Sequence, residues 1–146
     1  MKPDKGHSYL RKGRVSKEGH VYHVTFSTLN RQPYFLDFKL SRRFILTLKL
    51  DEELGYTKTL SYVVMPDHVH WLFQLQKGEL AKAVKRVKSV FSQRTDTRIW
   101  DYGFHDHAIR SEESLKGIAR YIVANPLRAG LVDRVADYPH WDSVWL

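Results

Sequence analysis

Apolar residues recur at every second position in short segments of the chain, a period that is typical of a β-strand with one buried face. The segment from Tyr22 to Phe26 alternates in this way. Two further segments flank the turn Met65-Pro66-Asp67, which predicts that they form a β-hairpin. The predicted strands span residues 22–28, 57–65, 68–76 and 104–110.

Two longer segments carry apolar residues three or four positions apart, the spacing that places side chains on one face of an α-helix. The first follows Asp37, which suits a helix N-cap, and Gly55 suits its C-terminal end. The second covers about residues 79–95. A third helix is expected after Ser111, and Pro126 ends it because the residue before a proline avoids the helical conformation.

The predicted order of elements is β-α-β-β-α-β-α. This order favours an antiparallel sheet with helices packed on it, the ferredoxin-like arrangement of the α+β class. The 146 residues contain no linker rich in Gly, Ser or Pro, so we expect one domain over residues 1–146. Residues 1–19 are rich in Lys and Arg and are expected to form a loose basic arm, which can be either a solvated terminus or a phosphate contact.

The composition favours a polyanionic partner. The chain has 24 Lys and Arg against 16 Asp and Glu, a net charge of +8, which is typical of proteins that bind nucleic acid or an anionic membrane. No apolar run approaches 18 residues and no signal peptide is evident, so we expect nucleic acid rather than a membrane, and a cytoplasmic location. The absence of cysteine excludes disulfides, thiolate nucleophiles and cysteine zinc sites.

The motif His68-Val69-His70 begins the second strand of the predicted hairpin. Alternate side chains of a strand share a face, so the two imidazoles lie on the same side, about 7 Å apart along the backbone. Such a pair can ligate one metal ion. The motif His105-Asp106-His107 has the same spacing, and either pair can equally consist of ordinary polar-face histidines, so spacing alone leaves the site undecided.

Tyr121 and Asn125 are four residues apart, which places them one turn apart on the same face of the third predicted helix. A phenol beside an amide oxygen can supply a nucleophile and an oxygen ligand to one site. Tyr121 taken alone is a weak signal, because the chain has eight tyrosines and most helical tyrosines pack with the hydroxyl in water.

Three blocks of sequence resemble the single-tyrosine HUH transposases (HUH endonucleases), specifically the branch of REP-associated tyrosine transposases. The blocks are Tyr62–Leu75 with its Met-Pro-Asp-His-Val-His motif, Trp100–Arg110, and Arg120–Val132 with its Asn-Pro-Leu-Arg-Ala-Gly-Leu-Val motif. The strand that begins at Tyr22 also fits. The similarity spans about residues 20 to 145, and three ordered blocks are more specific than any one motif.

The resemblance implies roles for particular residues. His68 and His70 are expected to bind a divalent ion, Tyr121 to act as the nucleophile, and Asn125 to complete the metal shell. Two histidines and an amide oxygen suit Mg²⁺ or Mn²⁺. The second histidine pair falls outside the family's metal motif, so we expect a structural role for it.

The reaction implied by the resemblance is DNA transposition by transesterification: single-stranded DNA is cleaved and rejoined through a 5′-phosphotyrosine intermediate. The implied partner is a hairpin formed by REP-like palindromes. The basic residues expected to contact DNA are Lys12, Arg14, Lys85, Arg86 and Arg128. We expect a monomer, as in the REP-associated branch, with a dimer as the alternative. A binding module without chemistry and a metal-dependent phosphodiesterase that uses water remain rival hypotheses.

Overall fold

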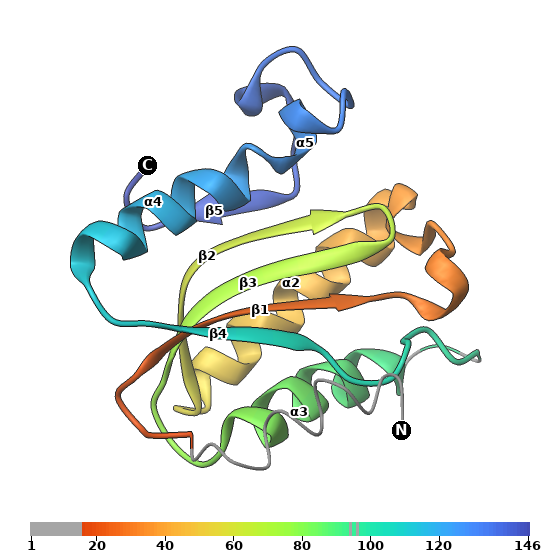
Figure 1. Ribbon diagram of the computed structural model, residues 1–146. Helices are drawn as coiled ribbons and strands as arrows, with labels where there is room; N and C mark the ends of the chain where they lie inside the picture. Colours follow the sequence, from red (N-terminus) through yellow and green to blue (C-terminus); the bar gives the residue numbers. More distant parts are fainter. Residues whose placement is uncertain (1–15, 94, 96) are drawn as a thin grey trace, which may run out of the picture.

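Five strands form one antiparallel sheet in the order β4-β1-β3-β2-β5 (Figure 1). The computed structural model describes residues 16–93, 95 and 97–146, so the predicted DNA contacts of Lys12 and Arg14 lie outside the described residues. The strands are β1 (Val21–Ser27), β2 (Thr57–Met65), β3 (His68–Leu75), β4 (His105–Ile109) and β5 (Trp141–Ser143). Strands 4-1-3-2 with their intervening helices make the ferredoxin-like unit, and the predicted α+β class is confirmed.

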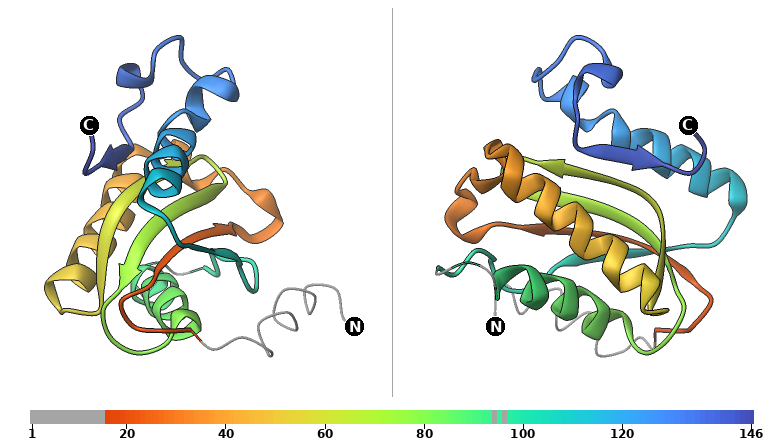
Figure 2. Two further views of the ribbon diagram at one scale, coloured as in Figure 1. Left: turned by 60° about the vertical axis from the view of Figure 1, so that its left-hand side comes forward. Right: turned by 180° about the vertical axis from the view of Figure 1, so that it is seen from behind.

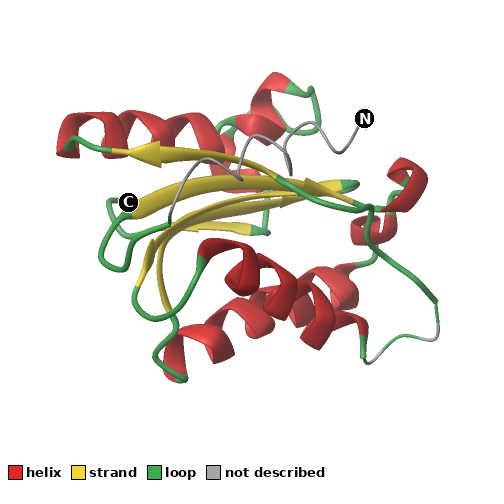
Figure 3. Cartoon of the chain, turned by 60° about the horizontal axis from the view of Figure 1, so that its bottom comes forward, coloured by secondary structure: helices red, strands yellow, loops and turns green. Residues whose placement is uncertain are grey.

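Helices cover both faces of the sheet (Figures 2 and 3). The α-helices are α2 (Phe38–Glu53), α3 (Leu80–Ser92), α4 (Glu112–Val123) and α5 (Asn125–Arg128). Short 3₁₀ helices are η1 (Leu29–Arg31), η2 (Tyr34–Leu36) and η3 (Val135–Asp137). None of the helices in the described part of the chain has the length and apolar character that crossing a bilayer requires.

The two-residue period of β3 divides its side chains between two apolar clusters. Trp71 and its alternate neighbours Val69, Phe73 and Leu75 are fully buried against α2 and α3. Leu72 points the other way, into a cluster that α4 completes. The predicted core face of the hairpin is confirmed, and its second strand begins at the first histidine of the motif, as predicted.

The caps predicted at Asp37, Gly55 and Ser111 are also confirmed. The Asp37 carboxylate accepts hydrogen bonds from the first backbone N–H groups of α2, and the Ser111 hydroxyl accepts one from the backbone N–H of Ser114 in α4. Gly55 follows α2 with a φ of +86°, a conformation that a residue without Cβ adopts at little cost. The third helix ends at Val123, three residues before Pro126.

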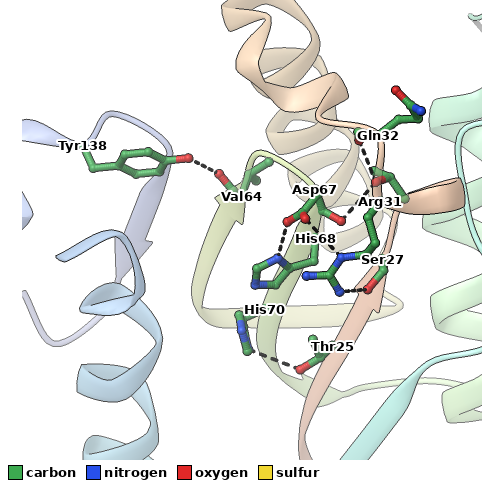
Figure 4. Close-up of polar contacts among 10 residues, drawn as sticks. Thr25, Ser27, Arg31, Gln32, Val64, Asp67, His68, His70 and Tyr138 are labelled. Atoms are coloured by element: carbon green, nitrogen blue, oxygen red, sulfur yellow. Dashed lines mark hydrogen bonds and ion pairs between the residues drawn. The ribbon is translucent and has the colours of Figure 1, made fainter. Parts of the chain in front are cut away.

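The C-terminal segment contains a strand that is not among the four predicted from the sequence. After α5, β5 pairs with β2 and adds a fifth strand to the sheet. The phenol of Tyr138 donates a hydrogen bond to the carbonyl of Val64, 2.6 Å away, and so ties the segment to the end of β2 (Figure 4). Three residues are too few to show a period, which is why this strand was missed.

A buried carboxylate joins both helices of one face to the sheet. Asp51 on α2 is 4% exposed and accepts hydrogen bonds from Arg86 on α3 and from the hydroxyl of Thr57 at the start of β2. The guanidinium of Arg86 also lies 3.9 Å from the ring centre of Tyr56. Arg86 is therefore engaged within the fold, and its predicted DNA contact stays a prediction.

We expect the Asp51→Ala variant to lower the free energy of unfolding by about 2–4 kcal/mol, because it leaves a partly buried guanidinium without its anion. Denaturant unfolding measures this loss. Glu53→Ala, an exposed site at the end of the same helix, is the matched control and should change stability by less than about 0.5 kcal/mol. Equal effects in the two variants would contradict the structural role of Asp51.

Candidate active site

The motif histidines lie on the face of the sheet that α4 partly covers. His68 and His70 are alternate residues of β3, and their ring centroids are 5.2 Å apart at an interplanar angle of 74°. In the antiparallel register, Ser27 of β1 is opposite His68 and Thr25 is opposite His70. Opposed residues share a face, so β1 contributes the polar surroundings of both imidazoles (Figure 4).

Asp67 orients His68. Its Oδ1 atom lies 2.8 Å from His68 Nδ1, and its Oδ2 atom accepts a hydrogen bond of 3.0 Å from Arg31 Nε. Burial alone would raise the pKa of the Asp67 carboxyl, but the hydrogen bond from His68 and the charge of Arg31 hold it below its ordinary value. An ionised carboxylate only accepts, so His68 Nδ1 carries the proton of this hydrogen bond, and Nε2 is the nitrogen that the contact leaves unengaged.

Arg31 reaches the site from an unusual backbone. Asn30 and Arg31 have φ values of +55° and +54°, and they are the only non-glycine residues with positive φ in the described part of the chain. Such conformations are costly and persist where the surroundings impose them. Thr28 helps to impose the conformation of Asn30 and Arg31, because its N–H donates to the Asp67 carbonyl and its hydroxyl donates to the Gln32 carbonyl. Arg31 belongs to no periodic pattern or motif, which is why it was not predicted as a site residue.

His70 is oriented by a second histidine. His70 Nδ1 lies 3.0 Å from His23 Nε2 and 3.2 Å from the hydroxyl of Thr25, and the His23 and His70 rings are stacked. Burial and neighbouring positive charges lower the pKa of His70 to about 3, and burial with the charge of His107 lowers that of His23 to about 4. Both rings are therefore neutral at pH 7, and one donates its N–H to the lone pair of the other.

Neutral imidazoles with Nδ1 engaged and Nε2 available are the form in which histidine binds a cation. Asp67 engages Nδ1 of His68, and His70 also leaves Nε2 available when its Nδ1 is the donor toward His23. The described residues contain no group of three or more His, Cys, Asp or Glu side chains arranged for a metal. The pair therefore fits two nitrogen ligands of a cation whose remaining ligands are amide, water or substrate oxygens.

Tyr121 faces this pair from α4. Its side chain is 50% exposed, and its ring centroid lies 6.3 Å from that of His70, with the rings nearly perpendicular. Its neighbour Ile122 is fully buried against the sheet and fixes the helix face that packs. The guanidinium of Arg128 lies 3.9 Å from the Tyr121 ring centre and donates a hydrogen bond of 2.8 Å to the Tyr121 carbonyl.

Asn125 lies in a different helix from Tyr121. The continuous helix expected through both residues ends at Val123, and Asn125 opens α5. Its amide nitrogen lies 3.3 Å from the Ile122 carbonyl, to which it donates. The break is consistent with Pro126, which lacks the backbone N–H that would continue the helix by donating to the Ile122 carbonyl. The metal-binding role of Asn125 stays a prediction.

The second histidine pair lies on the same face of the sheet. In the register of β1 with β4, His105 is opposite Thr25 and His107 is opposite His23. Both side chains are exposed on an edge strand. Their expected structural role stays a prediction. Of the other predicted DNA contacts, Lys85 is exposed on α3, on the opposite face of the sheet.

Comparisons with known proteins identify relatives of the chain. The family described as "Transposase IS200 like" matches residues 16–124. The REP-associated tyrosine transposase of Escherichia coli (strain K12) is 27% identical over 127 residues, which cover 84% of this chain and 75% of that protein. A solved structure of a REP-associated tyrosine transposase bound to a REP hairpin superposes with a TM-score of 0.75 and 25% identity, covering 88% of this chain and 79% of that one.

The lowered pKa values predict that the fold loses stability on acidification. An unfolded histidine titrates near pH 6.5, whereas His23 and His70 take up protons at about pH 4 and about pH 3 in the folded chain. Between the unfolded and folded pKa values, the unfolded chain binds more protons than the folded chain. The stability that depends on neutral His23 and His70 is therefore complete above about pH 6.5 and falls as the pH decreases. We expect denaturant unfolding to give a free energy lower by about 1–3 kcal/mol at pH 5 than at pH 7.

The variant His23→Gln tests the origin of this pH dependence, because glutamine does not titrate. The difference between pH 5 and pH 7 should become smaller in the variant. A pH dependence as steep as that of the unmodified chain would show that other groups produce it.

Proposed function

We propose that this chain, which belongs to the family of IS200-like transposases, cleaves and rejoins single-stranded DNA through a covalent bond to Tyr121. The observation that carries the proposal is the exposed phenol of Tyr121 beside the oriented His68–His70 pair. The match to a transposase solved with a REP hairpin supports a DNA hairpin with single-stranded flanks as the substrate. We further propose a monomer that acts on DNA in the bacterial cytoplasm.

The proposed reaction is an exchange of phosphodiester bonds. Tyr121 Oη attacks the scissile phosphorus and loses its proton, while the bond from phosphorus to the 3′ oxygen breaks. The products are a 5′-phosphotyrosine and a free 3′-OH. In the rejoining step, a 3′-OH attacks the phosphotyrosine and the phenol recovers its proton. The phosphotyrosine conserves the energy of the broken bond, so the reaction requires no nucleotide cofactor.

We propose that His68 and His70 hold a divalent cation, Mg²⁺ or Mn²⁺, with Asn125 as a further ligand. When bound, the cation polarises a non-bridging phosphate oxygen and stabilises the charge on the leaving oxygen. Asp67 and His23 hold the two imidazoles in the orientation that binding needs.

Two arginines supply positive charge around the phosphate. Arg128 keeps the Tyr121 ring in place by stacking on it, and its charge lies beside the phenol. The guanidinium of Arg31 is 60% exposed and lies beside His68 through its ion pair with Asp67. Cations of this kind bind the phosphate backbone and make binding dependent on salt.

The covalent intermediate is directly testable. Incubation with a labelled hairpin oligonucleotide that has single-stranded flanks and Mn²⁺ should give a protein–DNA adduct on a denaturing gel. The Tyr121→Phe variant should form no adduct, because it lacks the attacking oxygen. Tyr34→Phe, which removes a hydroxyl from a half-buried ring packed on the core, is the matched control and should form the adduct at the normal level.

Two results would overturn the proposal. Cleavage without an adduct that persists in Tyr121→Phe would indicate hydrolysis by water, and binding of the DNA without cleavage would indicate a passive binding module.

Calorimetric titration with Mn²⁺ tests the cation site without relying on activity. His70→Ala should abolish binding, because it removes one of two nitrogen ligands. His23→Ala should weaken binding by about 10–100-fold, the usual effect of losing the group that orients a ligand histidine. The control is His20→Ala, an exposed histidine before β1. Equal affinity in the His23 and His20 variants would exclude an orienting role for His23.

A further inference from the structure

A cavity of about 630 Å³ lies between α3 and the segment 98–104 that precedes β4. We propose that this cavity binds an unpaired nucleotide of the DNA substrate, with the base on Tyr102 and the phosphate beside Arg98 and Lys85. The proposal rests on the function proposed above and assigns part of its substrate to a second place on the protein. The cavity lies on the α3 side of the sheet, away from Tyr121 and the motif histidines.

The cavity is connected to the active site around one end of the sheet. The backbone N–H of Asp101 donates to the Ser27 carbonyl, and the N–H of Leu29 donates to the Ile99 carbonyl. Ser27 is opposite His68 in the sheet and accepts a hydrogen bond from Arg31. In Figure 1 the segment before β4 runs beside the end of β1. A DNA strand that leaves the active site past Arg31 therefore meets the rim of this cavity.

Tyr102 provides a surface for stacking. Its side chain is 70% exposed, and the guanidinium of Arg98 lies 4.0 Å from its ring centre. Arg98 is itself anchored by a hydrogen bond of 3.2 Å from Nε to the Trp100 carbonyl. An exposed aromatic ring held by an arginine is a common platform for an unpaired base, because every base has a flat face that can stack.

The charge of the cavity suits a phosphodiester. Among its described lining residues, Lys85, Lys88 and Arg98 are cationic and Asp101 is the single acid. Lys88 donates hydrogen bonds to the carbonyls of Asp101 and Gly103, so it holds the rim in shape. Burial also lowers the pKa of Lys88 to about 8. Lys85 is exposed at the edge, where a phosphate can reach it.

The floor of the cavity is apolar. Val84, Ile99 and Trp100 are almost completely buried beneath it. An apolar floor contacts the base without pairing its hydrogen-bonding edge, so we expect the site to accept different bases. Its combination of an aromatic ring, cations and an apolar floor matches the way in which proteins hold single strands without reading their sequence.

Binding measurements with two oligonucleotides test the proposal. One is a hairpin with single-stranded flanks, and the other is the same hairpin with blunt ends. Fluorescence anisotropy of the full chain should show that Tyr102→Ala weakens binding of the flanked hairpin by about fivefold or more, the effect expected for losing one stacked base. Binding of the blunt hairpin should change less than twofold. Tyr102→Phe keeps the ring and should bind normally.

A charge control separates the cavity from general electrostatics. Arg98→Ala and Lys49→Ala each remove one exposed positive charge, but Lys49 lies on α2, outside this cavity. Arg98→Ala, like Tyr102→Ala, should lower the affinity for the flanked hairpin more than the affinity for the blunt hairpin. Lys49→Ala should change the affinity for both oligonucleotides to the same extent. Equal losses on both oligonucleotides in Tyr102→Ala, or no loss on the flanked one, would overturn the proposal.

Failure of this inference is distinguishable from failure of the proposed function. If Tyr102→Ala binds both DNAs normally while unmodified protein forms the Tyr121 adduct, the nucleotide site is wrong and the cleavage mechanism stands. If Tyr102→Ala selectively loses affinity for the flanked hairpin while no adduct forms in unmodified protein, the nucleotide site stands and the cleavage mechanism is wrong.

Discussion

The register between β1 and β3 is the constraint on which the candidate site depends. It places Thr25 opposite His70 and Ser27 opposite His68, so that groups far apart in the sequence share one face. A slip of one residue would turn every β1 side chain to the other face of the sheet. The same slip would remove Phe26 from the aromatic cluster that it forms with α2 and the segment before β4. Core packing and site geometry are therefore set by a single pairing.

The sequence predicted the local parts of this arrangement and missed the parts that depend on tertiary pairing. The two-residue period correctly placed Trp71 and His70 on opposite faces, because that property belongs to one strand. No such period could reveal His23 as the partner of His70, since 47 residues separate them. The ion pair of Arg86 could not be predicted for a similar reason, because its anion, Asp51, lies on another helix.

Interactions within the candidate site replace the hydrogen bonds that its histidine rings lose on leaving water. Withdrawing a polar ring from water is unfavourable unless its hydrogen bonds are replaced. His23 and His70 replace them largely with each other, and Thr25 adds a hydroxyl. At His68 the replacement is a carboxylate whose charge is shared with Arg31. Each motif imidazole is thus fixed by protein groups on its Nδ1 side, which leaves the opposite edge of the ring for function.

The position of Tyr121 near the end of α4 has an electrostatic consequence. The aligned peptide dipoles of a helix give its C-terminal end a partial negative charge, which repels a phosphate. Tyr121 lies two residues before the last residue of α4, where this field is strongest. Arg128 donates directly to the Tyr121 carbonyl, one of the groups from which the field arises. This arginine therefore offsets the macrodipole at the place where, in the proposed reaction, a polyanion approaches Tyr121.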